Sequence, residues 1–250
     1  MVHTNCMEIP IIYEDEHMLA VNKPAGLLVH SSGREGQETL VDWLVAQYPS
    51  IKTVGEDLKI SSGKTIFKSG IVHRLDKDTS GVLLAAKTQD AFLFLKKQFQ
   101  ERSLKKTYRA IVYGAVKEKE GSIDLPIGRS ISDWRKRIAG TGRMVGNTRS
   151  AVTRYKVLDA NESYSYLEAY PETGRTHQIR VHLKALGHPI VCDHLYAPKR
   201  ECPITLGRLA LHAFAVELRG LKVGALRIEA SLPDDFGRGL ETLFPGLRAE

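Results

Sequence analysis

The sequence predicts an α+β fold, with a mixed, mainly antiparallel central sheet flanked by helices and loops. Two pairs of strand candidates are joined by short turns, at residues 9–22 and 151–170, as in hairpins. Three segments, at residues 39–46, 90–102 and 174–187, carry apolar residues at the spacing of an amphipathic helix. A chain of 250 residues can bury a core in one large domain, or in two lobes around a cleft.

The chain is basic and contains few cysteines. Its 36 Lys and Arg residues against 29 Asp and Glu residues give a formal charge of +7, which favours a polyanionic partner such as nucleic acid. Cys6, Cys192 and Cys202 are odd in number and lack CxxC spacing, so we expect free thiols in a reducing compartment. His188 and His194 flank Cys192, but the spacing fits no zinc pattern and predicts no metal site.

Cofactor and membrane signatures are missing from the sequence. The glycines near residues 140–146 lack GxGxxG spacing and a strand-to-helix context, so we expect no cofactor. No apolar run approaches roughly 18 residues, and the N-terminus has no basic-then-apolar signal pattern. We therefore expect a cytoplasmic protein with no membrane partner.

The first third of the chain combines a hairpin, a helix and a polar loop. The hairpin at residues 9–22 is followed by Lys-Pro-Ala-Gly at residues 23–26, where proline fixes φ and glycine permits an unusual turn. Thr39 is the expected N-cap of the helix at residues 39–46. Residues 49–69 are polar and contain several Gly and Ser residues, which predicts a surface loop.

The stretch His-Arg-Leu-Asp-Lys-Asp-Thr-Ser-Gly at residues 73–81 contains the main candidate for a functional carboxylate, Asp76. Its Thr-Ser-Gly end favours a tight turn, and the continuous apolar run at residues 82–86 predicts a strand buried on both faces. Asp76 thus lies at the edge of a rigid element, where a carboxylate can be aimed at a substrate. The alternative is an ordinary charged turn in which Asp76 pairs with Arg74 or Lys77.

The middle of the chain predicts a helix and a long strand. The helix at residues 90–102 places Phe92, Leu95 and Phe99 on one face, which we expect in the core rather than stacked on bases. The strand at residues 105–114 ends at glycine, and its alternation points Tyr108, Ala110 and Val112 to one side.

Residues 129–154 form a strongly basic segment. It contains one acid, Asp133, one tryptophan, Trp134, and three glycines, which predict a flexible loop suited to RNA phosphates and an unstacked base. The alternative is a solvated insertion. The basic residues are Arg129, Arg135, Lys136, Arg137, Arg143, Arg149 and Arg154.

The last third begins with the strand pair at residues 151–170 and continues with a helix. Gly174 precedes the helix, and Gly187 and Pro189 follow it. Its buried stripe is expected to be Ile179, Leu183 and Leu186, while His177, Arg180 and Lys184 share another face. Residues 208–213 and 227–230 alternate as further strands.

Several of these motifs resemble the RluA family of RNA pseudouridine synthases. Residues 73–81 match the family pattern His-Arg-Leu-Asp-x-x-Thr-Ser-Gly without a break, and residues 173–189 match a second motif closely. Weaker similarity lies in Lys-Pro-x-Gly at residues 23–26, in Lys-x-Tyr-x-Ala at residues 106–110, and around residue 209. The resemblance extends from about Ile9 to Phe236.

The resemblance implies a pseudouridine synthase-like fold with a catalytic cleft across the sheet. We expect residues 1–250 to form a single catalytic domain, with a basic insertion at about residues 129–150. Only about eight residues precede the first strand, so the N-terminal RNA-binding domain of the S4 type, common in the family, is expected to be absent. We also expect a monomer.

The resemblance assigns roles to individual residues. Asp76 is implied as the catalytic aspartate, Arg180 as its ion-pair partner and Tyr108 as the residue that stacks on the target base and takes part in proton transfer. Arg74 is implied to fill the space that the nucleotide vacates or to hold the flipped-out nucleotide, and Leu211 to line the base pocket. The remaining expected RNA contacts are His73, Lys23, Arg135, Lys136 and Arg137.

The family isomerises uridines in RNA to pseudouridine without metal or cofactor. An ionised Asp76 can attack the anomeric carbon or remove a ribose proton, and both routes stay open. Arg180 favours the ionised form through a planar pair of donors. The uridine must be flipped out of its stack, at about a few kcal/mol. The expected targets are large-subunit rRNA, tRNA or both.

Two other functions compete with this one. The first is a catalytically silent RNA-binding or chaperone protein on the same fold. The second is a hydrolase that cleaves N-glycosidic bonds and releases free base. The sequence departs from the family at Cys192, where the family usually has glycine, and this puts the local loop geometry in doubt.

Overall fold

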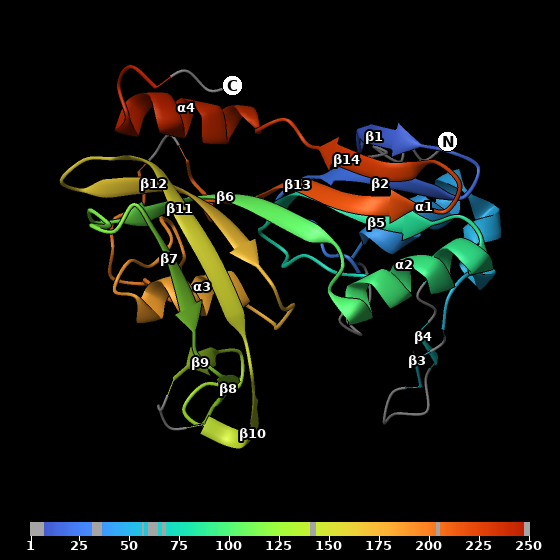
Figure 1. Cartoon of the computed structure of the whole chain (residues 1–250), viewed down its shortest axis with the longest axis horizontal. Coiled ribbons are helices and arrows are strands. Elements are labelled where there is room, and N and C mark those ends of the chain that lie inside the picture. The colour runs from blue at the N-terminus through green and yellow to red at the C-terminus, as the bar shows by residue number, and fades with distance from the viewer. Residues whose placement is uncertain are drawn as a thin grey trace.

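A nine-stranded sheet runs through the molecule (Figure 1). The computed structural model describes residues 8–31, 37–56, 58–59, 65–66, 69–140, 144–203 and 206–247; Cys6, Arg143 and part of the predicted loop at 49–69 lie outside these ranges. Among the strand pairs of this sheet in the described residues, only β5–β13 is parallel, so the predicted mixed, mainly antiparallel α+β fold is confirmed. The strand order is β1 (Ile11–Glu14), β2 (Met18–Lys23), β5 (Ser80–Ala86), β13 (Leu211–Gly220), β6 (Lys105–Tyr113), β12 (Tyr164–Pro171), β11 (Val152–Ala160) and β7 (Glu120–Asp124), with β14 (Gly224–Glu229) on β13.

β5 is buried along its whole length, as its apolar sequence predicts. Val82 and Leu84 join the apolar cluster under α2 (Gln89–Glu101), whereas Leu83 and Ala85 join the cluster under α1 (Leu40–Gln47). The split follows from the two-residue period of a strand. Thr39 caps α1 through a capping box with Asp42, as expected of an N-cap.

The other half of the sheet lies between α3 (Gln178–Ala185) and α4 (Asp234–Leu243), which Figure 1 shows on its two sides. Both helices contribute to the largest apolar cluster. The sequence did not predict α4, because Gly237 and Gly239 weaken its helix propensity; Gly239 admits the Leu206 side chain to the helix surface. Among the described residues, no helix has the length and apolar character needed to cross a membrane.

α3 is shorter than predicted. It begins at Gln178 rather than directly after Gly174, since His177 adopts a left-handed conformation with φ 58°. The Gln178 amide oxygen accepts hydrogen bonds from the Thr173 hydroxyl (2.6 Å) and from the Arg175 N–H (3.0 Å). These bonds close the preceding residues into a turn that competes with the helix.

The basic segment is a small antiparallel sheet and not the predicted flexible loop. It projects from the end of β7 and β11 in Figure 1. Gly146 has φ 71°, and the pairing register shifts between Val145 and Arg149, so this glycine supports a bulge rather than mobility. The strands are β8 (Ile127–Ser130), β9 (Arg137–Ala139) and β10 (Met144–Arg149), in the order β10-β8-β9. The predicted loop at 49–69 likewise contains η1 (Pro49–Thr53), β3 (Leu58–Lys59) and β4 (Thr65–Ile66).

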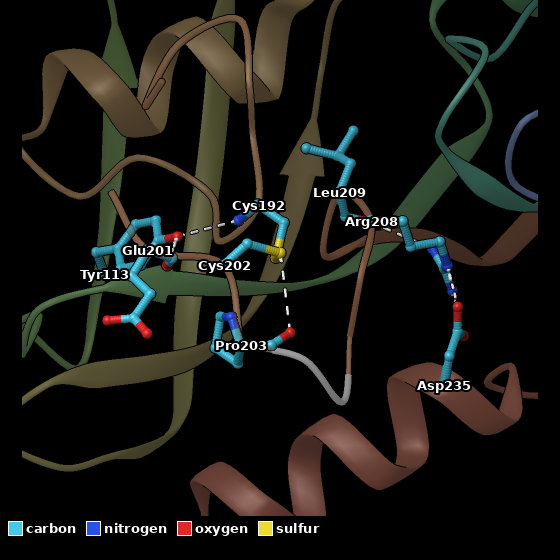
Figure 2. Close-up of a disulfide and its surroundings, with 8 residues drawn as sticks. All are labelled: Tyr113, Cys192, Glu201, Cys202, Pro203, Arg208, Leu209 and Asp235. Atoms are coloured by element: carbon cyan, nitrogen blue, oxygen red, sulfur yellow. Dashed lines mark hydrogen bonds and ion pairs between the residues drawn. A yellow bond between two sulfur atoms is a disulfide. The ribbon is translucent and has the colours of Figure 1, made fainter. Parts of the chain in front are cut away.

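Cys192 and Cys202 form a disulfide (Figure 2), so the expectation of free thiols is wrong for this pair. Their Cα atoms lie 4.7 Å apart, although ten positions separate them in the chain. The folded backbone brings the two loops together, which the spacing of the cysteines does not indicate.

Candidate active site

A cavity of about 450 Å³ opens where β5, β6, β13 and the turn before α3 meet. Its wall contains positively charged residues from four places in the chain, Arg74, Arg102, Lys106 and Arg175, which suits a polyanionic ligand. Six of the residues that the sequence singled out also line it: His73, Arg74, Asp76, Tyr108, Arg180 and Leu211.

The loop that carries Asp76 is fixed at both of its ends. Leu75 is buried in the core beneath α1, and the Thr79 N–H donates to the Asp76 carbonyl (3.2 Å). Gly81 has φ 112°, and a Cβ atom there would lie 2.2 Å from the Ala213 carbonyl oxygen. Glycine is therefore required for β5 to run beside β13.

Ser80 joins these two strands through a side chain. Its hydroxyl lies 2.8 Å from Nδ1 of His212, and Nε2 of the same imidazole lies 3.1 Å from the Ala230 carbonyl oxygen. Ser80 and His212 are both fully buried and do not line the cavity, so this pair links the two strands inside the core.

Lys23 is buried and does not line the cavity, so the structure does not support the predicted RNA contact of this side chain. Its side chain is fully buried, and Nζ donates to the carbonyl oxygens of Pro24 (2.8 Å), Leu27 (2.8 Å) and Lys77 (3.0 Å). Burial lowers the pKa of Lys23 to about 8. Because Lys77 follows Asp76, this buried ammonium ties the Lys-Pro-Ala-Gly turn to the Asp76 loop.

Arg180 lies between two carboxylates. Its Nη1 donates to Oδ2 of Asp76 (3.0 Å), while Nε and Nη2 donate to Oδ2 and Oδ1 of Asp193 (both 2.8 Å). Burial works to lower the pKa of Arg180, but the hydrogen bonds and charges of Asp193 and Asp76 outweigh it and hold this pKa above its ordinary value. The predicted juxtaposition of Asp76 and Arg180 is thus present.

Two more side chains surround this pair. His177 Nε2 lies 3.8 Å from Oδ2 of Asp76, and its Nδ1 lies 2.9 Å from the Tyr196 hydroxyl. The Tyr196 ring also packs against the guanidinium of Arg180, 5.0 Å from centroid to Cζ. Burial lowers the pKa of His177 against the opposing charge of Asp76, and Arg180 and Arg137 add to the lowering, which favours the neutral imidazole.

Comparison with known proteins agrees with this arrangement. Residues 17–185 match the family model described as RNA pseudouridylate synthase, a range that includes Asp76, Tyr108 and Arg180. The chain belongs to the RNA pseudouridylate synthase family. The expected family resemblance is therefore confirmed.

Relatives of the family span most of this chain. An RNA pseudouridine synthase of Synechocystis is 40% identical over 210 residues, which are 84% of this chain and 61% of that protein. The ribosomal large subunit pseudouridine synthase D of Nitrosomonas europaea is 39% identical over 94% of this chain and 65% of its own length. This chain thus spans less than two thirds of either relative.

Solved structures share the fold. Human RNA pseudouridylate synthase domain containing 1 superposes with a TM-score of 0.73 at 27% identity, over 97% of this chain and 90% of that one. Human RNA pseudouridylate synthase domain containing 4 gives a TM-score of 0.72 at 29% identity, over 94% and 92%.

The cavity has an aromatic and an aliphatic side chain beside Asp76. Tyr108 lies on β6 opposite Ala213 on one side and Ala169 on the other, so small neighbours leave its ring open to the cavity. Burial, and then the charge of Asp76, raises the pKa of Tyr108, which keeps the phenol protonated at pH 7. Leu211, at the start of β13, is 3% exposed and lines the same cavity.

His73 and Arg74 occupy different positions in the cavity wall. The His73 Nε2 accepts a hydrogen bond from the Leu84 N–H (2.9 Å), and its ring stacks on Phe99 at 4.7 Å. Burial lowers the pKa of His73 to about 3, so this side chain is neutral and bound to β5. Arg74 is exposed at the rim. Phe99, expected only in the core, is a cavity residue as well.

The structure does not bring Arg135, Lys136 and Arg137 to the cavity. Arg135 forms two hydrogen bonds with Asp133 (3.0 and 2.9 Å), and Lys136 lies 4.0 Å from the same carboxylate. The Arg137 N–H donates to the Tyr196 hydroxyl (2.8 Å), which connects the small sheet to the residues around Arg180.

Sequence reasoning missed Asp193, His177 and Tyr196 as site residues. The helical spacing of the sequence puts His177 on the same face as Arg180, and this spacing indicates that the two side chains lie near each other. Asp193 offered none, because it follows α3 in a separate turn and meets Arg180 only in the fold. Among the described residues, no three His, Cys, Asp or Glu side chains lie close enough together to hold a metal ion.

Proposed function

We propose that this chain isomerises selected uridines in structured RNA to pseudouridine, with large-subunit rRNA, tRNA or both as substrates. The observation that carries the proposal is the Asp76 carboxylate, 20% exposed and bound by one Arg180 N–H, at a cavity lined by Tyr108 and Leu211. The name of the Nitrosomonas relative supports the ribosomal substrate.

The proposed chemistry begins at Asp76. Arg180 binds Oδ2 and leaves Oδ1 to face the ribose of a uridine in the cavity. The carboxylate then attacks the anomeric carbon, or removes a ribose proton to give a glycal, and either step breaks the bond between the sugar and the uracil ring nitrogen. The uracil turns, and a ring carbon bonds to the anomeric carbon, which displaces the carboxylate in the first route and returns the ribose proton in the second. That ring carbon loses its hydrogen to solvent, and the freed ring nitrogen takes up a proton.

Tyr108 and Leu211 form the proposed base site. The aromatic ring offers a flat face for the uracil, and the protonated phenol can donate a hydrogen bond to a base oxygen. A base can reach this site only after it leaves its stack, at about a few kcal/mol. Arg74, exposed at the rim, is proposed to fill the vacated space or to hold the flipped nucleotide.

RNA binding is proposed to use the cavity wall and the small sheet β8–β10. Trp134 is 76% exposed there, and Arg135 and Lys136 lie beside it, which suits stacking on an unpaired base next to phosphates. The formal charge of +7 supports a polyanionic substrate.

The test uses the full chain with transcripts of rRNA domains and tRNAs that carry tritium at C5 of uridine. We expect tritium release and pseudouridine in the digested RNA. Release of free uracil instead would show the N-glycosidic hydrolase. RNA binding with neither product would show the catalytically silent RNA-binding protein.

A further inference from the structure

Asp193 controls how the Arg180 guanidinium is oriented. It takes two of the three hydrogen bonds that Arg180 makes to carboxylates, both at 2.8 Å, and Asp76 takes the remaining one at 3.0 Å. A bidentate pair fixes the plane of a guanidinium, whereas a single bond does not. The direction in which Nη1 points toward Asp76 is therefore set by Asp193.

The Asp193 carboxylate is itself immobilised. Its side chain is fully buried, and Oδ1 also accepts hydrogen bonds from the N–H groups of Leu195 (3.1 Å) and Tyr196 (3.0 Å). Buried carboxylates with this many donors are held in one rotamer, because any other would leave a charge unpaired.

The backbone before Asp193 is tied to the core. Cys192 adopts φ 58° and carries the disulfide to Cys202, and its N–H donates to the Tyr113 hydroxyl (3.2 Å). The Tyr113 hydroxyl donates in turn to the Glu201 carbonyl (2.6 Å), as Figure 2 shows. Asp193 thus acts from a rigid support.

We propose that Asp193 is a positioning residue for the reaction: it touches no substrate and acts through Arg180, which it aims at Asp76. This inference rests on the proposed function. Asp193 also has an electrostatic effect on Asp76. Because the two carboxylates share the single positive charge of Arg180, the negative charge of Asp76 is only partly neutralised.

The test is a double-mutant cycle on Asp193→Asn and Arg180→Ala, read out as kcat and KM for pseudouridine formation. Asparagine keeps an oxygen for the Leu195 and Tyr196 N–H groups but removes the charge. We expect Asp193→Asn to lower kcat by about 10- to 100-fold while KM changes by less than about threefold. In the Arg180→Ala background the same substitution should lower kcat no further, because its target is gone.

Asp235→Asn is the matched control. It removes the carboxylate partner of another bidentate pair, with Arg208 (Nη2–Oδ1 2.8 Å), away from the residues that line the cavity. Its kcat should equal that of the wild type. If Asp193→Asn does not fold, Arg180→Lys replaces it: lysine keeps the charge but cannot span both carboxylates, so kcat should fall as far as in Arg180→Ala.

The outcomes distinguish a failure of the inference about Asp193 from a failure of the proposed function. Wild-type kcat in Asp193→Asn, additive losses in the double variant, or full activity in Arg180→Lys each overturn the inference and leave the proposed function standing. A wild-type chain that makes no pseudouridine on any of the RNAs overturns the proposed function, and the role of Asp193 with it.

Discussion

Nη1 of Arg180 lies 3.0 Å from Oδ2 of Asp76, although 104 positions separate the two residues in the chain. α3 and the loop before β5 meet here because β13 and β6 place the two halves of the sheet side by side. The contact joins the partly exposed Asp76 carboxylate to the mostly buried Arg180 guanidinium.

Asp76→Asn should abolish pseudouridine formation and preserve the fold. The carboxamide has the shape of the carboxylate but neither attacks a sugar carbon nor removes a ribose proton. Tritium release should fall below detection, while RNA affinity and the unfolding midpoint stay near those of the wild type. Turnover by this variant would rule out Asp76 as the catalytic group.

Arg180→Ala should destabilise the protein by about 3 kcal/mol or more, because it leaves the buried Asp193 carboxylate without its cation. Adding Asp193→Asn should restore part of this loss, since the uncompensated charge is then removed. Urea unfolding of the wild type and the three variants measures both effects. A double variant less stable than Arg180→Ala would contradict the interpretation.

His212 should make folding stability depend on pH below neutrality. Burial lowers its folded-state pKa to about 4 from an ordinary 6.5, so the unfolded chain takes up the proton first. Its stabilising contribution is full above pH 6.5 and is lost as the pH falls toward 4, by about 1.4 kcal/mol per pH unit. Urea unfolding at pH 7, 6, 5 and 4 should show a smaller slope in His212→Gln, and equal slopes would count against the assignment.

Lys23 should matter for folding stability, whereas the basic side chains of the small sheet should matter for RNA binding. Lys23→Met leaves three carbonyl oxygens without their donor and should cost at least about 2 kcal/mol of stability. The salt dependence of RNA binding should not change in this variant.

Replacing Arg135, Lys136 and Arg137 together by glutamine should instead reduce the slope of log affinity against log salt concentration by about 1 to 3, with little loss of stability. Filter binding at roughly 50 to 300 mM salt, a range in which counterion release is resolved, measures RNA affinity. Urea unfolding measures stability.

Reduction of the Cys192–Cys202 disulfide should loosen the turn that carries Asp193. Opening a loop of this size removes roughly 2 to 3 kcal/mol of stability in the chain-entropy account. We expect a dithiol reductant to lower both the unfolding midpoint and kcat, and Cys202→Ser to reproduce the effect without reductant. A wild-type protein indifferent to the reductant, with the bond shown open by thiol titration, would contradict this prediction.

The sequence predicts the parts of the site that depend on local pattern. The buried strand after the Asp76 turn and the helix that presents Arg180 follow from apolar spacing, and the family motifs place Asp76, Tyr108 and Leu211 together. Contacts between distant side chains do not follow. The sequence predicts an RNA contact for Lys23, and only the fold shows its ammonium enclosed by carbonyl oxygens. Asp193 and the Cys192–Cys202 bond depend on the same long-range packing.

Gly81 shows what that packing means for mutational data. A side chain at this position would collide with the Ala213 carbonyl at 2.2 Å, so every substitution forces two central strands apart. In a random library scored for RNA modification, position 81 should be as intolerant as position 76. Variants at position 76 should lose RNA modification because the carboxylate is missing, whereas variants at position 81 should lose it because the sheet does not form. Measuring the abundance of each variant protein distinguishes the two causes.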